Sequence, residues 1–199
     1  MQIDVLVTFI FSVFLLTITP GPDITYVFFK SISDGKRDAI ELSLGLTSGL
    51  LFHTLLVIFG VSAILSSNDF YYNIIKYFGF FYFITLSVIS IIKKNDFDNK
   101  KNKTQNNFTT GLLMNVLNPK VSIFFIAFLP GFIFSDYIRI EIQFLVLGLI
   151  FWFTATLIFL IVVFISMRLK NKIQNLLENS NIKYVQAILF LLIAIWIIK

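Results

Sequence analysis

The sequence predicts an all-α membrane protein with six transmembrane helices, and three observations support that prediction. Of the 199 residues, 57% are hydrophobic and the mean hydropathy is +0.87. Charged residues make up only 14% of the chain, well under the roughly 25% of a soluble domain. The apolar residues fall into six long runs. Because so little polar surface cannot cover a soluble globule, we expect the runs to cross a bilayer as one domain, 1–199.

Each run is long enough to cross about 30 Å of hydrocarbon at about 1.5 Å per residue. The sixth run is the shortest, and the longest polar connection, 93–107, joins the third run to the fourth. The expected spans are 5–29, 40–65, 71–92, 108–134, 140–165 and 182–198.

The first span is interrupted near its middle by Thr19-Pro20-Gly21-Pro22-Asp23. The prolines lack an amide hydrogen, and Gly21 admits unusual backbone angles. Broken backbone at this depth is tolerated only inside protein or beside a polar cavity, and a charge there usually marks a substrate path. Freed carbonyls and a half-helix N-terminus at Asp23 would suit the ammonium and carboxylate of an amino acid. The alternative is a simple kink with Asp23 as a helix cap.

The second span carries Gly45, Gly49 and His53 at intervals of four residues, so the three form one stripe. Two small residues at this spacing allow another helix to approach closely, and we expect helix packing at the glycines, within the chain or in a homo-oligomer. His53 is the single histidine and suits proton coupling, although a hydrogen-bonded packing role is the alternative. In the third span, Tyr82 is expected to line a cavity.

The fourth span is interrupted by Asn118-Pro119-Lys120, and Asn115 shares a helix face with Asn118. Lys120 lies about 18 Å from the start of the span, which is too deep for its ammonium to reach the interface easily. It therefore needs a partner, and Asp23 is the candidate. The pair would either bind substrate or act as a structural ion pair between the two halves.

The six spans also form two halves, 1–92 and 108–199, and each half opens with a proline-interrupted span. Because each half has an odd number of spans, the second would lie upside down relative to the first. Broken helices at corresponding places in inverted repeats indicate a binding site near the middle of the membrane.

Basic residues are distributed unequally between the two sides of the predicted bundle. Three lie in the first loop, five in 93–107 and four in the fifth loop, which gives 12, against three on the other side. Cytoplasmic loops collect Lys and Arg. We therefore expect 93–107 in the cytoplasm and both termini outside.

Several function classes are disfavoured by the composition. The chain has no cysteine and one histidine, which leaves no plausible metal cluster. It contains no nucleophile elbow, P-loop or HExxH pattern, so we expect neither an enzyme nor a bound cofactor. The net charge of +5 comes from short clusters between spans, so a nucleic-acid partner is not expected.

Short motifs along the chain match one known family in order and spacing. They are Thr19-Pro20-Gly21-Pro22-Asp23, Gly35-Lys36-Arg37, Gly45-xxx-Gly49-xxx-His53, Gly79-xx-Tyr82, the segment GLLMNVLNPK at 111–120, and Phe128-Leu129-Pro130. In these motifs the chain resembles the LysE/RhtB family of bacterial amino-acid exporters. It departs from the family pattern at Asp38-Ala39, Ser87 and Gly131, which leaves the substrate open.

The resemblance implies a secondary transporter of the bacterial cytoplasmic membrane that exports amino acids or close derivatives in exchange for protons. From the residues alone, a channel or inorganic-ion carrier and a non-transporting accessory protein are the alternatives. The expected substrate-binding or coupling residues are Pro20, Gly21, Pro22, Asp23, His53, Tyr82, Asn115, Asn118, Pro119 and Lys120.

Overall fold

The computed structural model describes residues 2–63, 69–92, 106–166, 168–172, 179 and 181–198. Within these residues the regular structure is entirely helical, which confirms the predicted all-α class. The predicted end of the second span at 65 and nearly all of the lysine-rich connection 93–107 lie outside them.

The helices follow the predicted runs closely. α3 continues into the π-helical turn η1, and α7 continues into a π-helical turn, η2, and a 3-10 turn, η3. Their bounds are α1 Ile3–Ile18, α2 Pro22–Ser33, α3 Lys36–Leu56, η1 Val57–Val61, α5 Asp69–Ile92, α6 Asn107–Val116, α7 Pro119–Ile123, η2 Phe124–Phe128, η3 Leu129–Phe132, α8 Ile140–Ser166 and α10 Ile182–Ile198.

Both predicted breaks are present as sharp bends. Ile3–Ile18 and Pro22–Ser33 meet at 56°, and Asn107–Val116 and Pro119–Phe132 meet at 51°. Among the described residues, three continuous helices are long and apolar enough to cross a membrane, and five spans result if each bent pair counts as one. α10 is apolar but shorter, at 17 residues.

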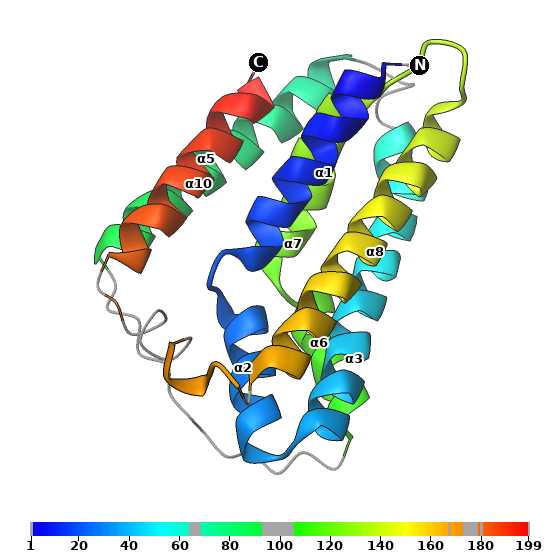
Figure 1. Cartoon of the computed structure of the whole chain (residues 1–199). Coiled ribbons are helices and arrows are strands. Elements are labelled where there is room, and N and C mark those ends of the chain that lie inside the picture. Colours follow the sequence, from blue (N-terminus) through cyan, green and yellow to red (C-terminus); the bar gives the residue numbers. More distant parts are fainter. Residues whose placement is uncertain are drawn as a thin grey trace.

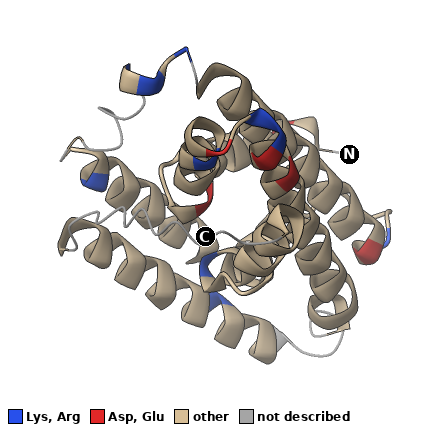
Figure 2. Ribbon diagram, turned by 90° about the horizontal axis from the view of Figure 1, so that it is seen from below, with Lys and Arg blue, Asp and Glu red and all other residues tan. Residues whose placement is uncertain are grey.

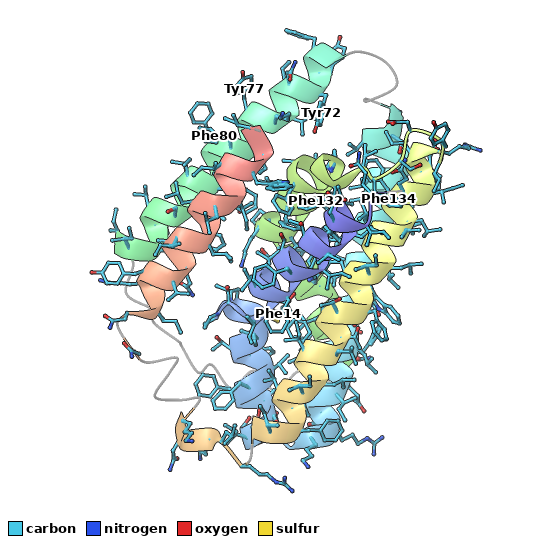
Figure 3. All side chains as sticks on the ribbon, turned by 45° about the horizontal axis from the view of Figure 1, so that its top comes forward. Phe14, Tyr72, Tyr77, Phe80, Phe132 and Phe134 are labelled. Carbon is cyan, nitrogen blue, oxygen red and sulfur yellow. The ribbon has the colours of Figure 1, made fainter. Side chains whose placement is uncertain are left out.

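The outer surface of the bundle is suited to lipid. Phe14 on α1 is 43% exposed and Tyr77 on α5 is 57% exposed, and both are labelled in Figure 3. Seen from below, most of the ribbon belongs to residues other than Lys, Arg, Asp and Glu (Figure 2). Large apolar side chains on an outer face are stable in hydrocarbon and costly in water. The chain is therefore a membrane protein.

The chain is arranged so that both termini lie at the same end, with the turn between α2 and α3 at the opposite end (Figure 1). α3 packs along α6 and α8, while α5 and α10 lie side by side and form a separate pair. In Figure 1, α1 and α7 lie between this pair and α8, and α6 lies beside α3.

Glycine contacts bring α3 and α6 together at backbone distance. A Cβ atom added to Gly45 would overlap the backbone of Phe108, and one added to Gly111 would overlap the backbone of Leu42. A Cβ on Gly49 would overlap the side chain of Asn115. The stripe of small residues is thus covered by α6 of the same chain.

One side chain fixes the connection between η3 and α8. The Gln143 Oε1 accepts hydrogen bonds from the amides of Phe134 at 2.8 Å and Ser135 at 3.0 Å. Its Nε2 donates to the carbonyls of Ser135 and Ile138, each at 2.7 Å. Because Gln143 is 1% exposed, this amide satisfies four backbone groups that would otherwise be unpaired away from water.

Candidate functional site

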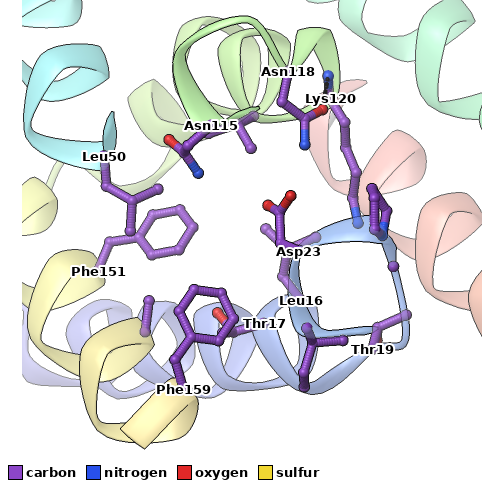
Figure 4. Close-up of a pocket in the computed structure, with 15 residues that line it drawn as sticks. Leu16, Thr17, Thr19, Asp23, Leu50, Asn115, Asn118, Lys120, Phe151 and Phe159 are labelled. Atoms are coloured by element: carbon purple, nitrogen blue, oxygen red, sulfur yellow. Dashed lines mark hydrogen bonds between the residues drawn. The ribbon is translucent and has the colours of Figure 1, made fainter. Parts of the chain in front are cut away.

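The two helix breaks lie against one internal cavity of about 60 Å³ (Figure 4). Polar residues from both breaks line part of it, and apolar residues from α1, α3 and α8 line the remainder. The lining residues are Leu16, Thr17, Thr19, Gly21, Pro22, Asp23, Ile24, Leu50, Asn115, Asn118, Lys120, Val121, Phe151, Ala155 and Phe159.

The first break exposes a carboxylate to this cavity. α1 ends at Ile18, and both the amide and the hydroxyl of Thr19 bond to the carbonyl of Leu15, at 3.1 and 2.6 Å. α2 restarts at Pro22, where the missing amide hydrogen costs no helical bond. Asp23 follows in the first turn, and its buried Oδ1 has no hydrogen-bond partner.

The second break is closed by its own asparagine. The Asn118 side-chain oxygen accepts a hydrogen bond from the amide of Lys120 at 3.1 Å and caps α7. Its carbonyl accepts from the amides of Val121 at 3.1 Å and Ser122 at 3.2 Å. The backbone of this break is therefore satisfied locally.

Asn115 connects the second break to α3. The Asn115 carbonyl accepts a hydrogen bond from the amide of Asn118 at 3.0 Å. The same carbonyl lies 3.2 Å from Nε2 of His53, and the tautomer with hydrogen on Nε2 is the one that donates to it. The side-chain Oδ1 of Asn115 is buried without a hydrogen-bond partner, and the side chain faces the cavity (Figure 4).

Lys120 extends from the second break toward the first. Its Nζ lies 4.7 Å from the ring centroid of Phe190 and 3.8 Å from the position that a Cβ on Gly21 would take. Asp23 is the candidate partner of Lys120, and no ion pair within 4.0 Å joins the two in the described structure. The two opposite charges line the same cavity at separate positions.

Two residues of α10 that contact the helix breaks were not predicted from the sequence. Nε2 of Gln186 donates a hydrogen bond to the carbonyl of Pro20, which the break has freed from the helix. Phe190, one turn further along α10, lies below the Lys120 ammonium. The sequence does contain a feature that could have indicated Gln186, since it is the one side-chain amide in the apolar helix Ile182–Ile198.

Some predicted residues lie outside the cavity lining. The side chain of Tyr82 is half-buried on α5 and packs against the hydrophobic core. His53 is 2% exposed and is not among the lining residues, although its Nε2 lies 3.2 Å from the carbonyl of Asn115. Pro20 and Pro119 flank the cavity and shape the breaks, but neither is among its lining residues.

The arrangement suits a small molecule that carries both charges. Two buried oxygen atoms, on Asp23 and Asn115, lack a hydrogen-bond donor, and Lys120 offers a cation nearby. Within the described ranges, no group of three or more His, Cys, Asp or Glu side chains could hold a metal ion. The site therefore offers acceptors for an ammonium and a donor for a carboxylate.

Two bent helices that meet at a cavity with charged side chains, inside an apolar bundle, are typical of a membrane transporter. The chain belongs to the LysE type translocator family, whose sequence model matches residues 14–199. The family consists of transporters, so the chain is not an enzyme.

Two curated relatives cover most of the chain. The uncharacterized membrane protein YrhP of Bacillus subtilis (strain 168) is 30% identical over 164 residues, and the match covers 76% of this chain and 78% of that protein. The homoserine/homoserine lactone efflux protein of Salmonella typhimurium is 30% identical over 138 residues, and the match covers 67% of this chain and 66% of that protein. No solved structure matches the chain.

Proposed function

We propose that this chain exports amino acids, or close derivatives, from the cytoplasm in exchange for protons. The observation that supports this most strongly is a cavity with two buried, unpartnered acceptors, Asp23 Oδ1 and Asn115 Oδ1, and one lysine. A buried acceptor without a donor costs about 1–3 kcal/mol. A substrate ammonium beside Asp23 would remove that cost at Asp23 Oδ1. The name of the Salmonella relative supports the same substrate class.

In this proposal the two charged ends of the amino acid bind at different breaks. The ammonium lies between Asp23 and Asn115, and the carboxylate lies against Lys120 and the N-terminus of α2. Each hydrogen bond to a charged group contributes about 1.5–3 kcal/mol, and the helix terminus favours an anion. A molecule that lacks either charge would lose one set of contacts.

Asp23 is also the proposed proton carrier. A carboxylate cannot bind a proton and pair fully with a substrate ammonium at the same moment, so binding of one displaces the other. Such competition produces exchange. His53 is the second candidate, but its Nε2 faces the carbonyl of Asn115 and its ring lies between those of Phe52 and Phe125. We therefore assign His53 to positioning Asn115.

Transport further requires the cavity to open. At about 60 Å³ it is smaller than the roughly 300–1,000 Å³ of typical ligand sites. We propose that the whole chain acts as one transport domain whose halves, 1–92 and 108–199, form an inverted repeat and rock about the site. In support, α3 of the first half packs on α6 of the second half, and α8 of the second half packs on α1 and α2 of the first. These two pairings are equivalent when the halves are exchanged, as an inverted repeat requires.

We place the chain in the bacterial cytoplasmic membrane with both termini outside. Among the described basic residues, Lys36 and Arg37 begin α3, directly after the α2–α3 turn. Arg168 and Lys170 follow α8. Both groups lie at the end of the bundle opposite the termini. Because the sequence has no cysteine, a single cysteine introduced at Ser33 or at Ser135 is the one thiol of its variant. A thiol reagent that does not cross the membrane then reports on which side that position lies. Labelling of Ser135→Cys from outside, and not of Ser33→Cys, is the expected result.

The function is tested in proteoliposomes by measuring flux of labelled amino acids under an imposed pH gradient. We expect saturable, gradient-dependent flux that Asp23→Asn abolishes and His53→Gln reduces only a few-fold. Asp38→Asn, the same change outside the cavity lining, is the matched control and should leave flux intact. Correct insertion of each variant is checked by the cysteine labelling described above.

The alternatives give different results in the same assay. A channel or inorganic-ion carrier would give ion flux that does not depend on amino acids, and an accessory protein would give none. Wild-type exchange by Asp23→Asn would contradict the role of this carboxylate, and loss of coupling in His53→Gln alone would assign the proton to the histidine.

A further inference from the structure

We infer that a stripe on α8, formed by Phe151, Ala155 and Phe159, receives the side chain of the substrate and restricts the cargo to neutral amino acids, with Ala155 setting the size limit. This inference rests on the proposed function, because it assumes that the two charged ends bind at the helix breaks. It names which amino acids the cavity accepts.

The polar and apolar parts of the cavity are separated in space. Figure 4 shows Leu50, Phe151 and Phe159 on the side opposite Lys120, with the Asp23 carboxylate between the two groups. A substrate whose ammonium and carboxylate face Asp23 and Lys120 therefore directs its third substituent toward α8. Positions 151, 155 and 159 recur every four residues, so they share one helix face.

The apolar side offers no partner for a charge. Among the described residues that line the cavity, Asp23 is the single acid and Lys120 the single base, and the proposal uses both for the backbone ends of the substrate. A lysine or glutamate side chain would be buried against aromatic rings without a counter-ion, which is costly. A hydroxyl is excluded much less strongly by an apolar pocket, so a neutral hydroxylated side chain remains acceptable.

The wall itself is firmly packed. Phe151 is 4% exposed, and its ring stacks on that of Phe125 at 5.1 Å with an 8° angle between planes. It also contacts the ring of Phe124 edge-on at 5.4 Å. Ala155 is 1% exposed and is the small residue between two phenylalanines on the stripe. The space that its short side chain leaves decides how long a substrate side chain can be.

The test compares transport efficiency, as kcat/KM, for alanine, homoserine, valine, leucine, phenylalanine, lysine and glutamate in proteoliposomes. Wild-type protein should prefer the best neutral substrate to lysine and to glutamate by about 100-fold or more. Ala155→Leu should lower kcat/KM for the larger neutral substrates by about tenfold or more relative to alanine. Phe153→Leu, on the lipid-facing side of the same helix and 58% exposed, is the matched control and should leave the order unchanged.

A second variant protects the test against a folding defect. Ala155→Gly removes one methyl group and should shift the preference toward larger side chains, the opposite direction to Ala155→Leu. A merely structural role for Ala155 would lower all substrates together in both variants, and that result would overturn the inference. Lysine or glutamate transport at the neutral rate would overturn it and leave the proposed function standing. Absence of amino-acid flux altogether would overturn both.

Discussion

The two helix breaks look alike in sequence but differ in how their polar groups are satisfied. At the second break, Asn118 caps the helix that follows it, and its carbonyl accepts two further amides. At the first break, the carbonyl of Pro20 takes its donor from Gln186 on α10, and Asp23 Oδ1 has no donor. The first break depends on groups outside itself, and the second is locally complete.

This difference separates two tasks within one site. A break that satisfies its own backbone keeps its shape whether or not cargo is bound. A break with a buried carboxylate oxygen that lacks a hydrogen-bond donor is stabilised by whatever supplies that donor. We therefore interpret the second break as the fixed support and the first as the responsive part, with Lys120 extending from the support to the responsive break.

Of the three replacements that test this difference between the breaks, replacing Lys120 should change transport most. Lys120→Met removes the cation that we assign to the substrate carboxylate, and we expect KM to rise about 100-fold, the equivalent of nearly 3 kcal/mol. KM for amino-acid export in proteoliposomes provides the measurement. Lys120→Arg keeps the charge and should stay within about tenfold of wild type. An unchanged KM in Lys120→Met would remove this residue from the site.

Replacing Gln186 should have an intermediate effect. Gln186→Leu leaves the Pro20 carbonyl without its donor, and a loss near 1.4 kcal/mol would lower transport efficiency about tenfold. Gln143→Leu is the same chemical change at another buried glutamine, away from the cavity. It should lower the melting temperature and leave KM unchanged. Equal effects of the two variants on KM would show that Gln186 acts only through general stability.

Replacing Asn118 should change transport least. Asn118→Ala removes a helix cap worth about 1 kcal/mol, so we expect a lower melting temperature and a KM within about threefold of wild type. Asn118→Ser retains an acceptor and should recover most of the stability. Thermal unfolding in detergent alongside the flux assay measures both quantities. A large loss of transport at unchanged stability would mean that Asn118 contacts the cargo and that the second break is not merely a support.

Much of this architecture could be predicted because its causes are local. Proline and glycine fix where the helices break, and a charge in an apolar run indicates a cavity, so Asp23 and Lys120 were both predicted to lie at the site. The contacts of α10 could not be predicted, because Gln186 meets the Pro20 carbonyl only through tertiary packing between residues 166 positions apart. The same limit explains why Tyr82, chosen for its polarity on α5, packs against the core, outside the cavity lining.

The π-helical turns were also beyond sequence reasoning. η1 and η2 lie in ordinary apolar stretches, Val57–Val61 and Phe124–Phe128, without proline or any polar residue. Such turns insert an extra residue into a helix when neighbouring contacts favour it, and they often occur near functional sites. Here η2 brings Phe124 and Phe125 against Phe151, beside the apolar wall of the cavity.

The four hydrogen bonds of Gln143 also bear on how the chain is made. Each joins residues no more than nine positions apart. Contacts of such short separation lose little chain entropy and form quickly. The turn between η3 and α8 can therefore close during translation, before the ribosome has synthesised α10. At that stage the Pro20 carbonyl still lacks Gln186 and the Lys120 ammonium still lacks Phe190, so both helix breaks gain these contacts only when the last helix inserts.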